Sequence, residues 1–160
     1  SWARWEKRAV TVGADDLLLS AIGPVEHVEL PARGERIDRD SPLFEVRRGE
    51  RSVRVLSPVS GRILETNEVL RLYPELMNEL PFGQGWVVRL EPQDADQQRK
   101  SLMHAGRARA WFRQEVDRAA DALASCDQVH GPALYRRLDR AGWNQLSTMF
   151  TARAGEPAEG

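Results

Sequence analysis

A dense group of charged residues lies within residues 44–61, between two short stretches of alternating apolar residues. The alternation predicts two strands, and the glycine between them can adopt the positive φ of a tight hairpin turn. The charged residues near this tip are Arg47, Arg48, Glu50, Arg51 and Arg54. Guanidinium groups bind carboxylates and phosphates bidentately, so the tip is a candidate anion or partner site. The alternative is that these charges only keep the hairpin soluble, since an exposed ion pair such as Arg47 with Glu50 contributes little to stability.

No set of residues in the sequence indicates catalysis. The three histidines and the single cysteine are scattered along the chain and are interpreted as structural or solvated: His27, His104, His130 and Cys126. The sequence contains no Ser/His/Asp arrangement, no metal-ligand spacing and no glycine-rich phosphate loop. We therefore expect a protein that is not an enzyme by itself and that holds no metal.

Length and composition predict a globular domain with an appendage. The chain has 160 residues, 41% of them apolar, and no run of 18 apolar residues or export signal, so membrane insertion is not expected. One cysteine excludes an internal disulfide framework and fits a reducing, cytoplasmic location. Residues 97–153 carry ten Lys/Arg against five acids, but the net charge of −1 argues against a nucleic-acid partner.

Residues 2–92 are predicted to be mainly β. Strands or hairpins are expected at 2–13, 25–31, 44–61, 61–68 and 86–92, and short helices at 15–24, 67–73 and 75–78. In the strand over 25–31, His27 and Glu29 should face away from Val28. Strands at this spacing with only small helices describe a sandwich or flattened barrel with added α structure.

Several short motifs follow one another at fixed spacing along residues 11–90. They are Thr11-Val12-Gly13, Ala21-Ile22-Gly23, Leu30-Pro31, Ser57-Pro58-Val59-Ser60-Gly61, Asn67-Glu68, Asn78 and Gly85-Trp86. Through these motifs residues 2–92 resemble the glycine cleavage system H protein family. The resemblance implies a lipoyl/biotinyl-like hybrid barrel-sandwich, in which a lysine at a hairpin tip carries lipoate on a swinging arm.

The sequence departs from this resemblance at the lipoyl position itself. The resemblance implies a tip of Glu-Ser-Val-Lys whose lysine precedes Ser57 by seven residues, and that position is Glu50; the motif's glutamate falls on Arg47. Lipoyl attachment forms an amide on an ε-amine, which a carboxylate cannot supply. The chain has two lysines, Lys7 and Lys100, and neither is close to this hairpin in the sequence. We therefore expect no cofactor at the usual site.

Residues 95–152 are predicted to form a helical hairpin that the family pattern lacks at this length. Apolar residues at steps of three and four indicate a long helix over 95–125, and Pro132 can open a second helix. The aromatic residues of this extension are candidate partner contacts, because aromatics often anchor interfaces: Trp111, Phe112, Tyr135, Trp143 and Phe150. The alternative is that the hairpin folds back on the barrel. Residues 153–160 are expected to be disordered.

These observations favour an interaction or scaffold subunit without lipoate, resembling the H protein, that docks onto a larger enzyme complex such as a multisubunit oxidoreductase. Its partner would be another protein, with no nucleic acid, membrane or metal involved. Two alternatives remain open. One is a small anion-binding regulatory protein that uses the arginine-rich tip, and the other is a lipoyl carrier modified at an unexpected lysine.

Overall fold

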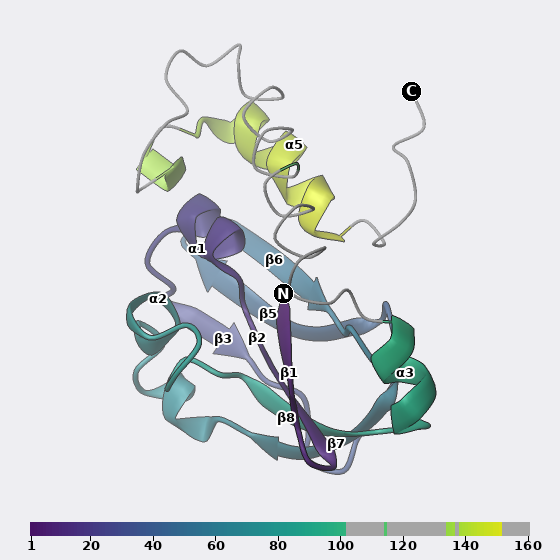
Figure 1. Ribbon diagram of the computed structural model, residues 1–160. Helices are drawn as coiled ribbons and strands as arrows, with labels where there is room; N and C mark the ends of the chain where they lie inside the picture. Colours follow the sequence, from purple (N-terminus) through teal and green to yellow (C-terminus); the bar gives the residue numbers. More distant parts are fainter. Residues whose placement is uncertain (102–113, 115–133, 137, 152–160) are drawn as a thin grey trace.

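Two antiparallel sheets form the body of the protein. A computed structural model describes residues 1–101, 114, 134–136 and 138–151 (Figure 1). The larger sheet has the order β1 (Trp2–Glu6), β2 (Ala9–Gly13), β8 (Val88–Pro92), β7 (Gly61–Thr66) and β4 (Arg36–Ile37). The smaller sheet has the order β3 (His27–Glu29), β5 (Pro42–Arg48) and β6 (Arg51–Leu56). The prediction of a mainly β sandwich is confirmed.

The core lies between these sheets, and each sheet contributes rows of buried apolar side chains that are neighbours across its strands. In the smaller sheet Val28, Val46 and Val53 are neighbours across three strands, and none is more than 2% exposed. His27 and Glu29 are exposed on the opposite side of β3, as predicted. In the larger sheet Val10, Leu90 and Ile63 are neighbours in the same way and are also buried.

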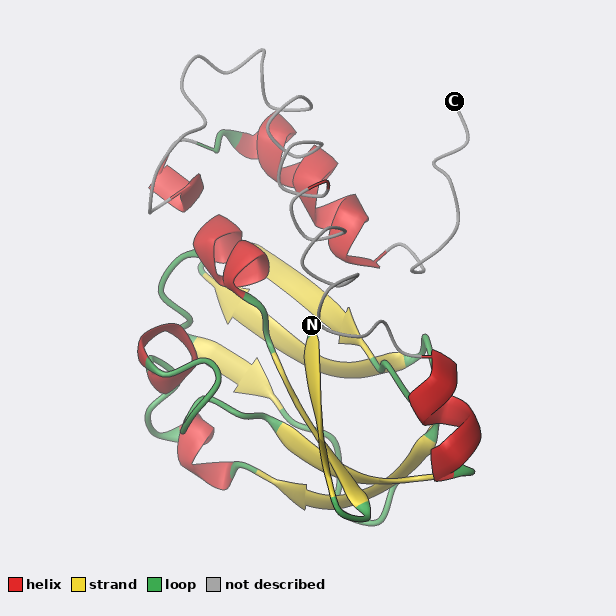
Figure 2. Ribbon diagram, viewed as in Figure 1, coloured by secondary structure: helices red, strands yellow, loops and turns green. Residues whose placement is uncertain are grey.

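Short helices connect the strands (Figure 2). They are α1 (Asp16–Ile22), the 3-10 helix η1 (Glu68–Arg71) and α2 (Leu76–Glu79), close to the predicted positions. The N-terminus of α1 is capped by Asp15, whose Oδ1 accepts the Leu18 N–H at 2.9 Å. Leu70 of η1 and Met77 of α2 are fully buried, which fixes both short helices to the barrel.

The C-terminal extension is described in four pieces. Of the predicted helix over 95–125, the structure describes α3 (Ala95–Ser101) and residue 114, so most of that prediction lies outside the described residues. The predicted second helix is divided into a 3-10 turn, η2 (Leu134–Arg136), and α5 (Arg140–Thr151). Asp139 explains why α5 begins where it does. Its Oδ1 accepts the Gly142 N–H at 2.7 Å, and its carbonyl accepts the Trp143 N–H.

Helix α5 packs on the barrel beside β6, an edge strand of the smaller sheet (Figure 1). Leu138, Trp143 and Leu146 belong to the hydrophobic core and are 6%, 7% and 1% exposed. Covering an edge strand in this way also limits pairing with other chains. The alternative in which the extension folds back on the barrel therefore describes η2 and α5.

Substitution of Leu146 tests this packing. Leu146→Ala should lower the free energy of unfolding by about 2–4 kcal/mol, because it leaves a cavity between α5 and the barrel. The exposed neighbour Gln145→Ala is the control and should change it by less than about 0.5 kcal/mol. Urea denaturation measures both. Equal effects of the two variants would contradict the packing of α5.

Candidate functional site

The apex of the β5–β6 hairpin is a two-residue turn. Arg48 pairs with Arg51, so Gly49 and Glu50 form the turn, and Gly49 has a φ of 54°. The Gly49 N–H donates to Glu26 Oε2 at 2.8 Å, which fixes the turn to the barrel. Glu50 is exposed, and its carboxylate has no hydrogen bond or ion pair among the described residues. The predicted hairpin with an acid at its tip is therefore present.

Arg48 and Arg51 contact the C-terminal extension. Arg51 donates to the carbonyls of Tyr135 at 3.0 Å and Leu138 at 2.5 Å, and its guanidinium lies 5.2 Å from the centroid of the Trp143 ring. Arg48 lies 4.2 Å from the centroid of the Tyr135 ring. Burial, together with the neighbouring charge of Arg48, lowers the pKa of Arg51. Two tip arginines are thus held by this chain's own aromatic rings and carbonyls.

The Tyr135 ring also depends on a glycine at the end of α1. Gly23 has a φ of 86°, and a Cβ at this position would lie 2.5 Å from the Tyr135 ring. Only glycine can combine this backbone conformation with such a close contact. The end of α1, the hairpin tip and η2 therefore pack as one unit.

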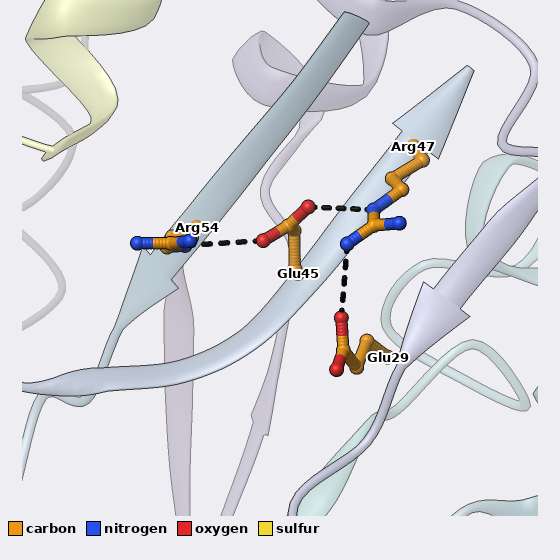
Figure 3. Close-up of polar contacts among 4 residues, drawn as sticks. All are labelled: Glu29, Glu45, Arg47 and Arg54. Carbon is orange, nitrogen blue, oxygen red and sulfur yellow. Dashed lines mark hydrogen bonds and ion pairs between the residues drawn. The ribbon is translucent and has the colours of Figure 1, made fainter. Parts of the chain in front are cut away.

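Arg47 and Arg54 belong to a second set of contacts, centred on Glu45 (Figure 3). Glu45 accepts from Arg47 Nε at 2.6 Å and from Arg54 Nε at 3.1 Å, and Arg47 also donates to Glu29 at 3.1 Å. We call these four residues the Glu45 network. Partial burial of the Glu45 carboxyl raises its pKa, but the hydrogen bonds and charges of Arg47 and Arg54 outweigh this and hold the pKa below its ordinary value.

The Glu45 network corrects one sequence-based expectation. Arg47 pairs with Glu45 and Glu29 and not with Glu50. The reason is strand alternation: Glu45 and Arg47 are two residues apart on one face of β5, whereas Glu50 lies in the turn. Glu45 was not singled out from the sequence. The signal that could have revealed it is the hairpin register, which places it directly opposite Arg54.

The remaining candidate residues do not form a reactive site. Tyr135 and Phe150 are half-buried and Trp143 is buried, and all three contact this chain. The other candidates lie outside the described residues: Trp111, Phe112, His104, His130 and Cys126. Within the described part of the chain, no three His, Cys, Asp or Glu residues are grouped to hold a metal ion. No helix in that part is both long and apolar enough to cross a membrane.

A lipoyl group does not fit the hairpin apex, because the side chain there ends in a carboxylate and offers no amine. The two lysines are elsewhere. Lys7 lies in the turn between β1 and β2, at the opposite end of the barrel from the β5–β6 tip in Figure 1, and Lys100 is in α3.

The sheets, the short helices and the protruding hairpin define a lipoyl-type hybrid barrel-sandwich. The model of the glycine cleavage H-protein family matches residues 1–115, and the chain belongs to this family. The glycine cleavage system H protein of Thermus thermophilus is 38% identical over 93 residues, covering 58% of this chain and 73% of that protein. The H protein of Halalkalibacterium halodurans is 35% identical over 96 residues, covering 60% and 75%. The crystal structure of an H protein from Mycobacterium marinum matches with a TM-score of 0.52 and 28% identity, covering 53% of this chain and 67% of that one.

Ionisation of the Glu45 carboxyl group should make the stability of the fold depend on pH. Its pKa is lower in the folded state than its ordinary value of 4.5, so its contribution is complete above that value and is lost as pH falls through the folded pKa. Glu45→Gln should lower the free energy of unfolding by about 1–2 kcal/mol at pH 7, and by progressively less as the pH falls below 4.5 and the carboxylate becomes protonated. Denaturant titrations at several pH values measure this difference.

The control is Glu65→Gln, which breaks an exposed pair with Arg89. Its effect should stay below about 0.5 kcal/mol at every pH, because exposed ion pairs contribute little. A Glu45→Gln effect that did not change with pH would contradict the role assigned to the Glu45 carboxylate.

Proposed function

We propose that this chain is a non-lipoylated member of the H-protein family that serves as an interaction or scaffold subunit of a larger enzyme complex. The observation that carries the proposal is Glu50, an exposed acid at the apex where the family resemblance places a lipoyl lysine. A carboxylate cannot form the lipoyl amide, so the barrel is retained without its prosthetic arm. Catalysis then belongs to the partner, for which a multisubunit oxidoreductase is the class we propose.

The packing of the extension supports a role as a scaffold subunit rather than as a lipoyl carrier. In a swinging-arm carrier the hairpin tip must stay accessible, so that the lipoyl arm it bears can visit several partners in turn. Here Arg48 and Arg51, on either side of the apex, are fixed to Tyr135, Leu138 and Trp143. A tip held by this chain's own extension suits a stationary scaffold better than a carrier that transfers groups between partners.

Anion binding at the tip has less support. Each of its four arginines already contacts a carboxylate, a carbonyl or an aromatic ring of this chain. A phosphate or carboxylate ligand would have to displace these partners or share them. We therefore rank this function below partner docking.

Intact mass after co-expression with a lipoate ligase tests the proposal. The unaltered chain should give one unmodified peak, whereas Glu50→Lys should gain a lipoyl group, because it restores an exposed ε-amine at the apex. Glu50→Gln is the matched control and should remain unmodified. A lipoyl addition to the unaltered chain would refute the proposal.

A second function, that of a carrier modified at Lys7, is favoured by one specific observation. Glu6 pairs with Ala9, so Lys7 and Arg8 form a two-residue hairpin turn, and Lys7 is exposed with a φ of 51°. A lysine at a hairpin apex is the arrangement that the family resemblance associates with lipoate. Lys100, on helix α3, lacks this setting.

The two lysines can be separated by substitution. If the chain is a carrier modified at Lys7, the lipoyl mass should disappear in Lys7→Arg and persist in Lys100→Arg. If the chain is a scaffold without lipoate, the unaltered chain and both variants should have the unmodified mass. Size-exclusion chromatography of the protein from its native source is the complementary measurement, and a lone monomer there would count against a scaffold.

A further inference from the structure

The strongly exposed apolar side chains of the described residues are concentrated in one segment. The most exposed large ones are Val69 at 50%, Leu72 at 77%, Tyr73 at 54%, Leu80 at 45% and Phe82 at 51%. All five lie within 14 consecutive residues around η1 and α2. Clustering of this kind marks interaction sites more often than scattered exposure does. We call these five residues the η1–α2 surface.

The backbone beneath this surface is firmly held. The buried Asn67 amide donates to the carbonyls of Gln84 and Trp86, both at 2.7 Å. The Asn78 side chain accepts from the Val25 N–H at 2.8 Å and donates to the Gly23 carbonyl at 3.0 Å. With Leu70 and Met77 buried, the exposed apolar groups stand on a fixed frame. A fixed frame lowers the entropy lost when a partner binds.

Three of the apolar groups share one face. The carbonyl of Val69 accepts from the N–H groups of Leu72 at 3.1 Å and Tyr73 at 2.9 Å. These three residues therefore occupy positions i, i+3 and i+4 of a helical turn, which bring their side chains together. Such a trio can anchor the apolar side of a partner helix.

The charges next to the trio indicate the sign of the partner. Glu68 is paired with Arg71 at 2.6 Å, but Glu75 and Glu79 are exposed and have no ion pair among the described residues. They stand four residues apart at α2, where like charges repel. A cation from outside would relieve this repulsion.

From these observations we propose that the η1–α2 surface docks a basic amphipathic helix of a partner protein, whose apolar side chains cover Val69, Leu72 and Tyr73 and whose Lys or Arg groups pair with Glu75 and Glu79. A second copy of this chain fits less well, since two-fold symmetry would set the acids near their own equivalents. A membrane also fits less well, because anionic headgroups repel the two acids. The inference deepens the proposed docking function but concerns a surface distinct from the hairpin tip.

Peptide titration by fluorescence anisotropy tests the proposal on the full chain. The probe is a labelled 14-residue helical peptide with Leu at i, i+3, i+4 and i+7 and Lys elsewhere, and its partner probe has Glu in place of Lys. The Lys peptide should bind saturably and at least about tenfold more tightly than the Glu peptide. Absence of saturable binding, or equal binding of both probes, would overturn the proposal.

Substitutions then place the binding. The double variant Leu72→Ser with Tyr73→Ser should weaken binding of the Lys peptide about tenfold or more, and so should Glu75→Lys with Glu79→Lys. The matched control is Asp38→Lys with Asp96→Lys, which changes the net charge equally at exposed sites elsewhere. It should weaken binding less than about twofold. Equal weakening by both charge reversals would mean non-specific attraction and would overturn the proposal.

Three further measurements keep the outcomes separate. Thermal unfolding should show unchanged midpoints for the variants, because the substituted side chains are exposed. Concentration-dependent dimerisation lost in the Leu72/Tyr73 variant would assign the surface to a second copy instead. Vesicle binding lost in the same variant would assign it to a membrane. The lipoyl mass measurement is independent, so the proposed function and this surface can fail separately.

Discussion

The register of the β5–β6 hairpin is the constraint on which the site depends. Val46 faces Val53 toward the core, while Glu45 faces Arg54 on the other side of the sheet. Because side chains alternate between the two faces, a slip by one residue would place charged groups in the core and valines in water. The loss of buried apolar area would far exceed the gain from any surface ion pair. Core packing therefore determines that Glu50 lies in the turn.

The same register creates a problem that the C-terminal extension solves. It sets Arg48 directly opposite Arg51, and like charges in such a pair repel each other. Tyr135 presents its ring to Arg48, and the carbonyls of Tyr135 and Leu138 accept from Arg51. The two guanidiniums are thus stabilised without an external anion. The extension also buries Trp143 beside Arg51. The same contacts therefore cover the barrel and hold Arg51 in place at the hairpin tip.

Sequence reasoning succeeded where local patterns decide the structure. Period-two alternation located the strands, and the motif order indicated the family and the apex position of Glu50. It was less informative where distant residues meet. The start of α5 depends on capping by Asp139, and the partners of Arg51 lie more than 80 residues away in the chain. Glu45 escaped notice because its importance arises from cross-strand pairing with Arg54 and not from a local motif.

The distribution of satisfied and unsatisfied groups separates two faces of the barrel. Around the hairpin, arginines, aromatic rings and carboxylates largely neutralise one another within the chain. Around η1 and α2, apolar side chains face water, and Glu75 and Glu79 lack counter-ions among the described residues. Apart from Glu50, the charged groups of the hairpin face already have partners, so this face has less free energy to gain from a second protein than a face with exposed apolar area and unpaired acids. Docking through the arginine-rich tip would require existing contacts to break. We therefore expect a partner to gain more binding free energy at η1 and α2 than at the tip.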